Sequence, residues 1–242
     1  MAGEVFSQTL VTCNAVNDTT TIELKNLDID EVYDIIEKIQ ESFDFKFDKN
    51  ELEHVTTFGE LCDIITNKVQ GDSTSDCTTQ QAFYKLRKAV SKTLLIDTDC
   101  IKTDTTLLDL FPKQNRKQRV KEFETELGFS ADILDIKPWM GWTILIGFVG
   151  SLIMFFFNWK IAVSGLTVST FFSWVTIKFF STELKLLTVG QLAEKMSREN
   201  YKKARRNTAT VNKNEIPQKI KELFSKYFDL NESVLTREAT FV

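Results

Sequence analysis

The chain has 242 residues, of which 34 are acidic and 30 basic, so its formal net charge is -4. This acidic balance excludes general nucleic-acid binding, which requires a basic surface. Charged residues make up 26% and hydrophobic residues 43% of the chain, which excludes intrinsic disorder. The length allows one large or two small domains.

The first predicted helix covers residues 28–45, DIDEVYDIIEKIQESFDF. Its apolar residues recur at helical spacing and form one stripe, which consists of Ile29, Val32, Ile35, Ile36, Ile39 and Phe43. Asp28 is placed to cap the helix, with Glu31 three residues later. The same segment carries several carboxylates against the single Lys38: Asp28, Asp30, Glu31, Asp34, Glu37 and Glu41. The pattern predicts an amphipathic helix with an acidic face.

A short pattern that starts a helix occurs twice. In TTFGELCDII, Thr57 and Glu60 have the spacing of a capping box, and in LTVGQLAEKM the pair is Thr188 and Gln191. A longer repetition relates residues 85–108 to residues 218–242. Its matched pairs are Ser91 with Ser225, Lys92 with Lys226, Ile96 with Leu230, Ile101 with Leu235 and Thr106 with Thr240. The two repetitions together indicate an internal repeat.

A basic helix is predicted over residues 113–129, with Val120, Phe123 and Leu127 facing inward. Its cations, and those of a second segment nearer the C-terminus, are Lys113, Arg116, Lys117, Arg119, Lys121, Lys202, Lys203, Arg205 and Arg206. We expect these nine residues, the basic patch, to face anionic lipid headgroups or an acidic protein partner. The alternative is an ordinary solvated helix face.

A long apolar block lies between the two basic segments. WMGWTILIGFVGSLIMFFF has 19 residues without a charge, and IAVSGLTVSTFFSWVTIKFF has 20 with only Lys178. A helix of either length would reach about 28 to 30 Å, the thickness of a hydrocarbon core. Only three residues, Asn158 to Lys160, separate the two segments, so residues 139–180 predict a two-helix transmembrane hairpin. A buried hairpin inside a water-soluble core is the alternative.

The flanks of the hairpin predict its orientation. Lys137 precedes it, and Lys185, Lys195 and Arg198 follow it, against one lysine in the turn. We therefore expect two spans in the cytoplasmic (inner) membrane, with both termini in the cytoplasm. The start, MAGEVFSQTLV, lacks the basic and apolar regions of a signal peptide.

The sequence contains no pattern that is typical of a catalytic or metal-binding site. Cys13, Cys62, Cys77 and Cys100 are scattered without a CxxC pair, and His54 is the only histidine. Phosphate-binding loops and a serine nucleophile elbow are missing from the sequence. We therefore expect no enzyme and no metal site.

These segments, in this order, resemble the acyl carrier protein family. KIKELFSKYFDLNESVLTREATFV is similar to the family's first helix and following loop, DEVYDIIEKIQESFDFKF to its second helix, and ELEHVTTFGELCDII to its third and fourth. Residues 80–129 resemble helices one and two of another copy, and ELKLLTVGQLAEKM resembles its end. The resemblance covers most of the chain outside the apolar block.

The resemblance implies an all-α fold with two acyl-carrier-like four-helix units. The first would comprise residues 21–70, completed by residues 214–242 if the chain ends form one split domain. The alternative is that the C-terminal helix pairs with another molecule in a domain swap. The other expected segments are a second unit at 78–137 and 181–197, the inserted hairpin at 139–180, and a basic linker at 198–213.

The family carries acyl groups on phosphopantetheine, attached to a serine that follows an aspartate where the second helix starts. In the first copy Asp28 takes the place of that aspartate and Ile29 that of the serine. In the second copy the corresponding residues are Pro112 and Lys113. Both copies therefore lack the carrier serine, and phosphopantetheine is not expected. Ser73 in GDSTSD is the remaining candidate for attachment of phosphopantetheine, with a polar linker as the alternative.

The expected function is that of a membrane-anchored docking or scaffolding module near lipid or acyl metabolism. Its partners would be the bilayer and either basic enzymes, which in the family dock on the acidic second helix, or an acidic carrier protein. A homo-oligomer is also open, because small residues on both spans allow close helix packing: Gly147, Gly150, Ser151, Ser164, Gly165 and Ser169. The alternative function is an active tethered carrier modified at a non-standard serine.

Overall fold

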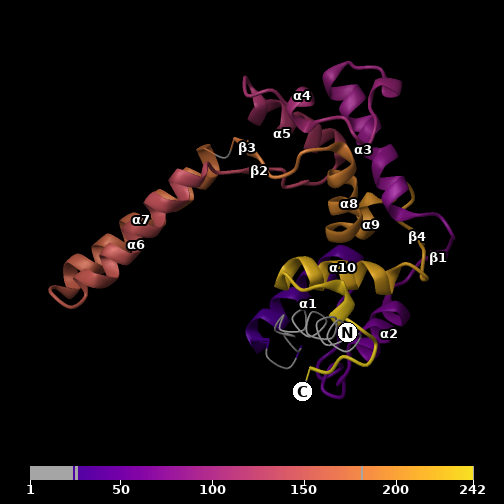
Figure 1. The fold of residues 1–242 in the computed structure, drawn as a ribbon, viewed down its shortest axis with the longest axis horizontal. Helices are drawn as coiled ribbons and strands as arrows, with labels where there is room; N and C mark the ends of the chain where they lie inside the picture. The colour runs from indigo at the N-terminus through magenta and orange to yellow at the C-terminus, as the bar shows by residue number, and fades with distance from the viewer. Residues whose placement is uncertain (1–23, 25–26, 181, 242) are drawn as a thin grey trace, which may run out of the picture. The chain divides into compact units, whose positions relative to one another are not determined.

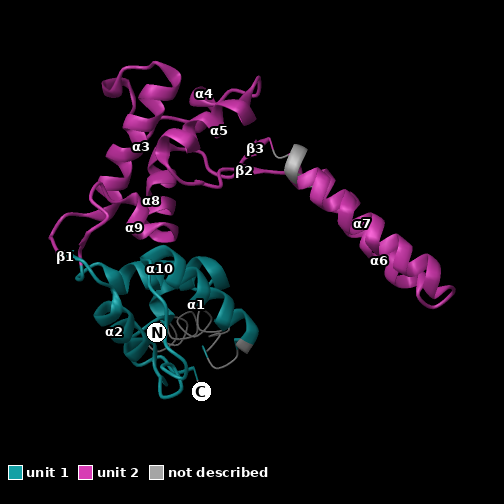
Figure 2. Ribbon diagram, turned by 180° about the vertical axis from the view of Figure 1, so that it is seen from behind, with its two compact units in different colours: residues 1–72, 213–242 teal, residues 73–212 magenta. Residues whose placement is uncertain are grey.

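The computed structural model describes residues 24, 27–180 and 182–241. Within these residues the structure is mostly helical, with α-helices α1 to α10 and strands of only two residues each (Figure 1). The mostly helical structure agrees with the expectation of an all-α protein. The chain divides into two compact units, shown in Figure 2. Unit 1 comprises Met1–Asp72 and Lys213–Val242, and unit 2 comprises Ser73–Asn212.

Unit 1 is built from both ends of the chain. Its helices are α1 (Ile29–Phe43), α2 (Phe58–Lys68), α10 (Ile216–Phe228) and the 3-10 helix η3 (Glu232–Val234). Helix α10 packs against both α1 and α2. The core includes Ile35, Ile39, Phe43, Ile65 and Phe224, all fully buried.

The helix ends of unit 1 follow from local chemistry. The Asp28 carboxylate caps α1 by accepting a hydrogen bond from the Asp30 amide at 2.9 Å. Thr57 and Glu60 form the predicted capping box at the start of α2. The short third helix expected just before α2 is absent from the described residues. Residues 49–54 form successive turns instead, held by bonds three residues apart such as that from the Glu53 amide to the Asn50 carbonyl at 3.2 Å.

Unit 2 is organised around α3 (Thr78–Leu94), which packs against α5 (Arg116–Leu127), α8 (Val189–Glu199) and α9 (Tyr201–Ala204). The shorter elements are η2 (Thr98–Cys100) and α4 (Leu107–Leu110). Helix α5 buries Val120, Phe123 and Leu127, as its pattern predicts. Strands β2 (Leu134–Asp135) and β3 (Glu183–Leu184) pair antiparallel, and β1 (Asp72–Ser73) pairs with β4 (Thr210–Val211).

Residues 198–213 are not a linker, contrary to the sequence-based expectation. Helix α9 and the residues after it belong to the folded part of unit 2, and Tyr201, Ala204 and Val211 are fully buried. The Tyr201 hydroxyl accepts a hydrogen bond from the Asn212 amide at 3.0 Å. The charges of this segment suggested a solvated connection, but its apolar residues complete the core.

Between β2 and β3 the chain forms two long apolar helices, α6 (Pro138–Met154) and α7 (Trp159–Phe180). They lie side by side along their length in both views (Figures 1 and 2). Small residues lie at their contact. A Cβ atom added to Gly147 would be 3.2 Å from the Ser169 hydroxyl, and one on Gly165 would be 2.8 Å from the Ser151 hydroxyl. Four of the six predicted small residues therefore contribute to this contact, whereas Gly150 faces open space and Ser164 is exposed.

The two units contain the same backbone joint at the start of the capped helix. In unit 1, Thr57 forms an antiparallel bridge with Thr240. The surrounding amide-to-carbonyl hydrogen bonds run from Phe58 to Ala239 (2.8 Å), from Gly59 to Arg237 (2.9 Å) and from Phe241 to Thr56 (3.0 Å). Residues 56–59 are thereby tied to the C-terminal segment, which comes from the far end of the chain.

In unit 2, Thr188 forms the equivalent bridge with Thr106. Its hydrogen bonds run from Val189 to Thr105 (3.0 Å), from Gly190 to Thr103 (2.8 Å) and from Leu107 to Leu187 (2.8 Å). Thr188 and Gln191 form the second predicted capping box. The same partners therefore recur at each position of the sequence repeat.

Two further contacts explain why the repeat has a serine and a glycine at matching positions. The Ser91 hydroxyl donates to the Ile96 carbonyl at 2.7 Å, and the Ser225 hydroxyl donates to the Leu230 carbonyl at 2.7 Å. At the capped helices, a Cβ atom on Gly59 would lie 2.7 Å from the Arg237 carbonyl oxygen, and one on Gly190 would lie 2.9 Å from that of Thr103. Only glycine fits this close approach of two backbones.

Candidate functional site

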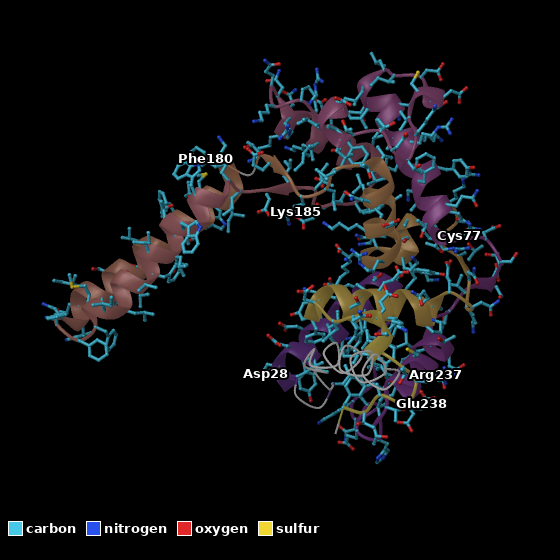
Figure 3. The ribbon with its side chains drawn as sticks, viewed as in Figure 1. Asp28, Cys77, Phe180, Lys185, Arg237 and Glu238 are labelled. Carbon is cyan, nitrogen blue, oxygen red and sulfur yellow. The ribbon has the colours of Figure 1, made fainter. Side chains whose placement is uncertain are left out.

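The acidic face of α1 is intact on the surface of unit 1. All six predicted carboxylates are exposed, starting with Asp28 at the N-terminal end of the helix (Figure 3). Asp34 accepts a hydrogen bond from the Tyr227 hydroxyl at 3.3 Å, and the Lys38 ammonium lies 4.1 Å from the centre of the Tyr227 ring. Burial and the neighbouring Asp34 carboxylate raise the pKa of Tyr227. Tyr33, on the same helix, is 66% exposed.

The helix starts show which residues replace the carrier serine. Asp28 is the N-cap of α1 and Ile29 its first residue. Helix α5 begins three residues later than the sequence count placed it, with Asn115 as the N-cap and Arg116 as the first residue. Neither start carries a hydroxyl group. Ser73 is exposed and lies in the two-residue strand β1, away from any helix start.

Three residues of the basic patch are not on the surface, which corrects the expectation for them. Arg116, Lys202 and Arg205 are buried, with exposures of 2%, 8% and 0%. Arg116 donates to the carbonyls of Phe111 (2.7 Å) and Thr182 (2.6 Å), so it ties α5 to the segment that follows α7.

Arg205 holds unit 2 together in a similar way. Its guanidinium donates to the Thr74 hydroxyl (2.6 Å), the Thr210 hydroxyl (3.1 Å), the Thr78 hydroxyl and the Asp76 carbonyl (3.3 Å). These buried arginines are stabilised by oxygen atoms from distant segments, which a sequence pattern does not reveal. The remaining cations of the patch are exposed: Lys113, Lys117, Arg119, Lys121, Lys203 and Arg206.

The three cysteines in the described part of the chain are free, and two of them are exposed. Cys62 is buried, and burial raises the pKa of its thiol to about 12. Cys77 and Cys100 are exposed and unpaired with each other, and Cys13 lies outside the described residues. The described residues contain no group of three or more His, Cys, Asp or Glu side chains that could hold a metal ion.

The apolar helices expose most of their large side chains. Ile146 and Val168 are each 67% exposed, and Phe171 is 66% exposed. Among the described residues one helix, α7 over Trp159–Ile177, is long and apolar enough to cross a membrane. Helix α6 is apolar but shorter than the predicted span, because Phe155–Phe157 form a turn after Met154.

A second charged feature of unit 2 was missed by the sequence analysis. Three cations of α3 line a surface cavity together with Arg206: Lys85, Arg87 and Lys88. The signal in the sequence was the run KLRK at residues 85–88, which was used only to align the repeat.

Comparison with protein-family models, curated proteins and solved structures found no match for this chain. By its own structure, the described part of the chain is a mostly helical protein with one candidate membrane-spanning helix.

Proposed function

We propose that this protein is a membrane-anchored, acyl-carrier-like module that docks partner proteins without carrying an acyl group. The observation that carries the proposal is the start of α1, where an exposed acidic face is combined with Ile29 in place of a serine. The resemblance to the acyl carrier protein family supplies the meaning of this combination, because partner enzymes of that family dock on an acidic second helix.

The exposed apolar surface of α6 and α7 supports membrane anchoring. The helix pair exposes large apolar side chains, such as Ile146, Leu152, Val168 and Phe171. Leaving apolar surface in water costs roughly 25 cal/mol of free energy per Å². The three tryptophans Trp139, Trp142 and Trp159 are also exposed near the helix ends, where indole rings favour the membrane interface. We propose that both helices cross the inner membrane and leave both termini in the cytoplasm.

The electrostatics of α1 support docking of a basic partner. Six exposed carboxylates on one helix create a negative field that steers a positively charged surface and suppresses acidic ones. In unit 2, the exposed cations of α5 have the opposite sign, so the two units would not attract the same partner. These cations suit anionic headgroups or an acidic carrier protein.

Photo-crosslinking from α1 tests the docking function. Benzoylphenylalanine at Tyr33, which is 66% exposed, is expected to form a protein adduct in native membranes. The double replacement Asp30→Lys and Glu37→Lys, one turn away on either side, should lower the adduct yield roughly tenfold, because it reverses the local field.

The matched control is Glu53→Lys with Glu238→Lys, which makes the same charge change on exposed residues of unit 1 outside α1. Equal loss of adduct in both double variants would contradict docking on α1.

The intact mass of the protein, after co-expression with a broad-specificity phosphopantetheinyl transferase, distinguishes the two candidate functions. An unmodified mass supports docking alone, whereas one added phosphopantetheine that disappears in Ser73→Ala would establish the active carrier.

Cysteine labelling tests the proposed topology. In a variant without the four native cysteines, Asn158→Cys in the turn between α6 and α7 should react with a membrane-impermeant maleimide in intact cells. In a second variant, which keeps Cys100 as its single cysteine, this exposed thiol of unit 2 should react only after lysis. Labelling of both positions only after lysis would show that the helix pair does not cross the membrane.

A further inference from the structure

A basic pocket lies on α3 in unit 2. It has a volume of about 750 Å³ and is lined mainly by charged side chains: Lys85, Arg87, Lys88, Arg206 and Glu126, with Tyr84 at its wall. A smaller cavity of about 270 Å³ adjoins it, since both share Tyr84 and Arg206. The lining has four cations against one carboxylate, so its net charge is +3 (4 - 1).

Most of this positive charge is not neutralised within the described residues. Arg87 is paired with Asp99 at 2.7 Å, but no ion pair to a described carboxylate involves Lys85, Lys88 or Arg206. The Lys85 ammonium donates to the Lys203 carbonyl at 2.5 Å, and burial lowers its pKa. A half-buried ammonium without a carboxylate partner is destabilised by desolvation, and a bound anion would remove that cost.

The guanidinium and the backbone of Arg206 are both held in place by residues of α3. The guanidinium of Arg206 stacks on the Tyr84 ring, with 5.0 Å from its central carbon to the ring centroid. The Arg206 amide donates to the Gln81 side-chain oxygen at 3.0 Å, so the backbone is held as well. A pre-positioned guanidinium loses less conformational entropy when it binds a ligand.

The sequence repeat supplies an internal comparison. Because Ser91 corresponds to Ser225, Lys85 corresponds to Lys219 and Lys88 to Glu222. In α10, Lys219 is paired with Glu222 at 2.8 Å, three residues away. Unit 1 therefore neutralises this lysine within its own helix, whereas unit 2 has a second lysine where the glutamate would be. Lys219 is therefore held by a glutamate of its own helix, whereas Lys85 has no such glutamate and is available to a ligand.

We propose that the pocket on α3 binds a phosphate-bearing ligand with at least two negative charges. The guanidinium of Arg206 and the ammonium groups of Lys85 and Lys88 match phosphate oxygens in charge and hydrogen bonding. Such a phosphate belongs either to a soluble compound or to a lipid headgroup. The proposal is independent of the docking function assigned to α1.

Calorimetric titration of the full chain with pyrophosphate, in a non-ionic detergent, tests the proposal. The unmodified chain is expected to bind one pyrophosphate per protein. Lys88→Glu should weaken binding roughly tenfold or more, since it replaces an attractive charge by a repulsive one and gives Lys85 the partner that Lys219 has. Lys121→Glu, an equal charge change at an exposed α5 residue outside the pocket, should change the affinity by less than about twofold.

The fold is checked by helix content and melting, and Arg206→Gln replaces Lys88→Glu as the test if the latter melts lower. Phosphatidic acid added to the micelles distinguishes the two phosphate sources. Competition with pyrophosphate by phosphatidic acid, but not by phosphatidylglycerol, assigns the pocket to a headgroup, and undisturbed pyrophosphate binding assigns it to a soluble phosphate. The proposal is overturned if neither pyrophosphate nor phosphatidic acid binds, or if Lys121→Glu weakens binding as much as the pocket variants.

Discussion

Replacing Arg205 with methionine is expected to lower the free energy of unfolding of unit 2 by about 3 kcal/mol or more. The guanidinium is fully buried and donates to oxygens of Thr74, Asp76, Thr78 and Thr210. Methionine fills part of the volume but makes none of these hydrogen bonds, and a hydrogen bond to a charged group contributes about 1.5 to 3 kcal/mol. Urea denaturation of the full chain, followed by circular dichroism, measures the change.

The neighbouring residue is the control for this prediction. Arg206 is exposed and its guanidinium contacts the Tyr84 ring, so Arg206→Met should change the free energy of unfolding by no more than about 1 kcal/mol. If Arg205→Met instead kept full stability and reduced association with anionic vesicles, Arg205 would belong to the membrane-facing patch after all. The pair of variants therefore decides between a structural and a surface role for one cation.

Deleting residues 237–242 is expected to abolish the cooperative folding of unit 1. The deletion removes the partners of the Phe58 and Gly59 amides, and it removes Phe241, whose ring centre is 6.2 Å from that of Phe224. The start of α2 would lose its bridge, and the core between α2 and α10 would lose an aromatic side chain. Hydrogen exchange followed by mass spectrometry should show lost protection in α1, α2 and α10.

Unit 2 provides the internal reference for this truncation. Its joint uses Thr106 and Thr188, so protection in α3 and α8 should be unchanged. Deletion of Val242 alone controls for the change of terminus. Equal loss of protection in both units would mean that the C-terminal segment supports the whole chain rather than unit 1.

Local patterns predicted the elements whose stabilising contacts are close in sequence. The Asp28 cap and both capping boxes depend on residues two to three positions apart, and the structure contains all three. The inward residues of α5 followed from helical spacing. The contact between Gly147 and Ser169 followed from the preference of paired apolar helices for small residues.

The errors concern residues whose environment is built by distant segments. Arg116 was assigned to the surface, but its acceptor Thr182 is 66 residues away, on the other side of the helix pair. Arg205 finds Thr74 at a separation of 131 residues. The pocket on α3 was missed for the same reason, because Arg206 and Glu126 reach it from other elements. A charged side chain in a sequence is assigned to water by default, and only the tertiary structure shows the exceptions.

The shared joint of the two units also determines the order in which the protein can fold during synthesis. Unit 1 is closed by Arg237, Ala239 and Phe241, which leave the ribosome after all of unit 2 and both apolar helices. Until then α1 and α2 have no α10 to pack against. Unit 2 has all its segments earlier and is free to fold first. Of the two units, unit 1 is therefore completed last, so α1 gains its packing partner α10 only after all of unit 2 has been synthesised.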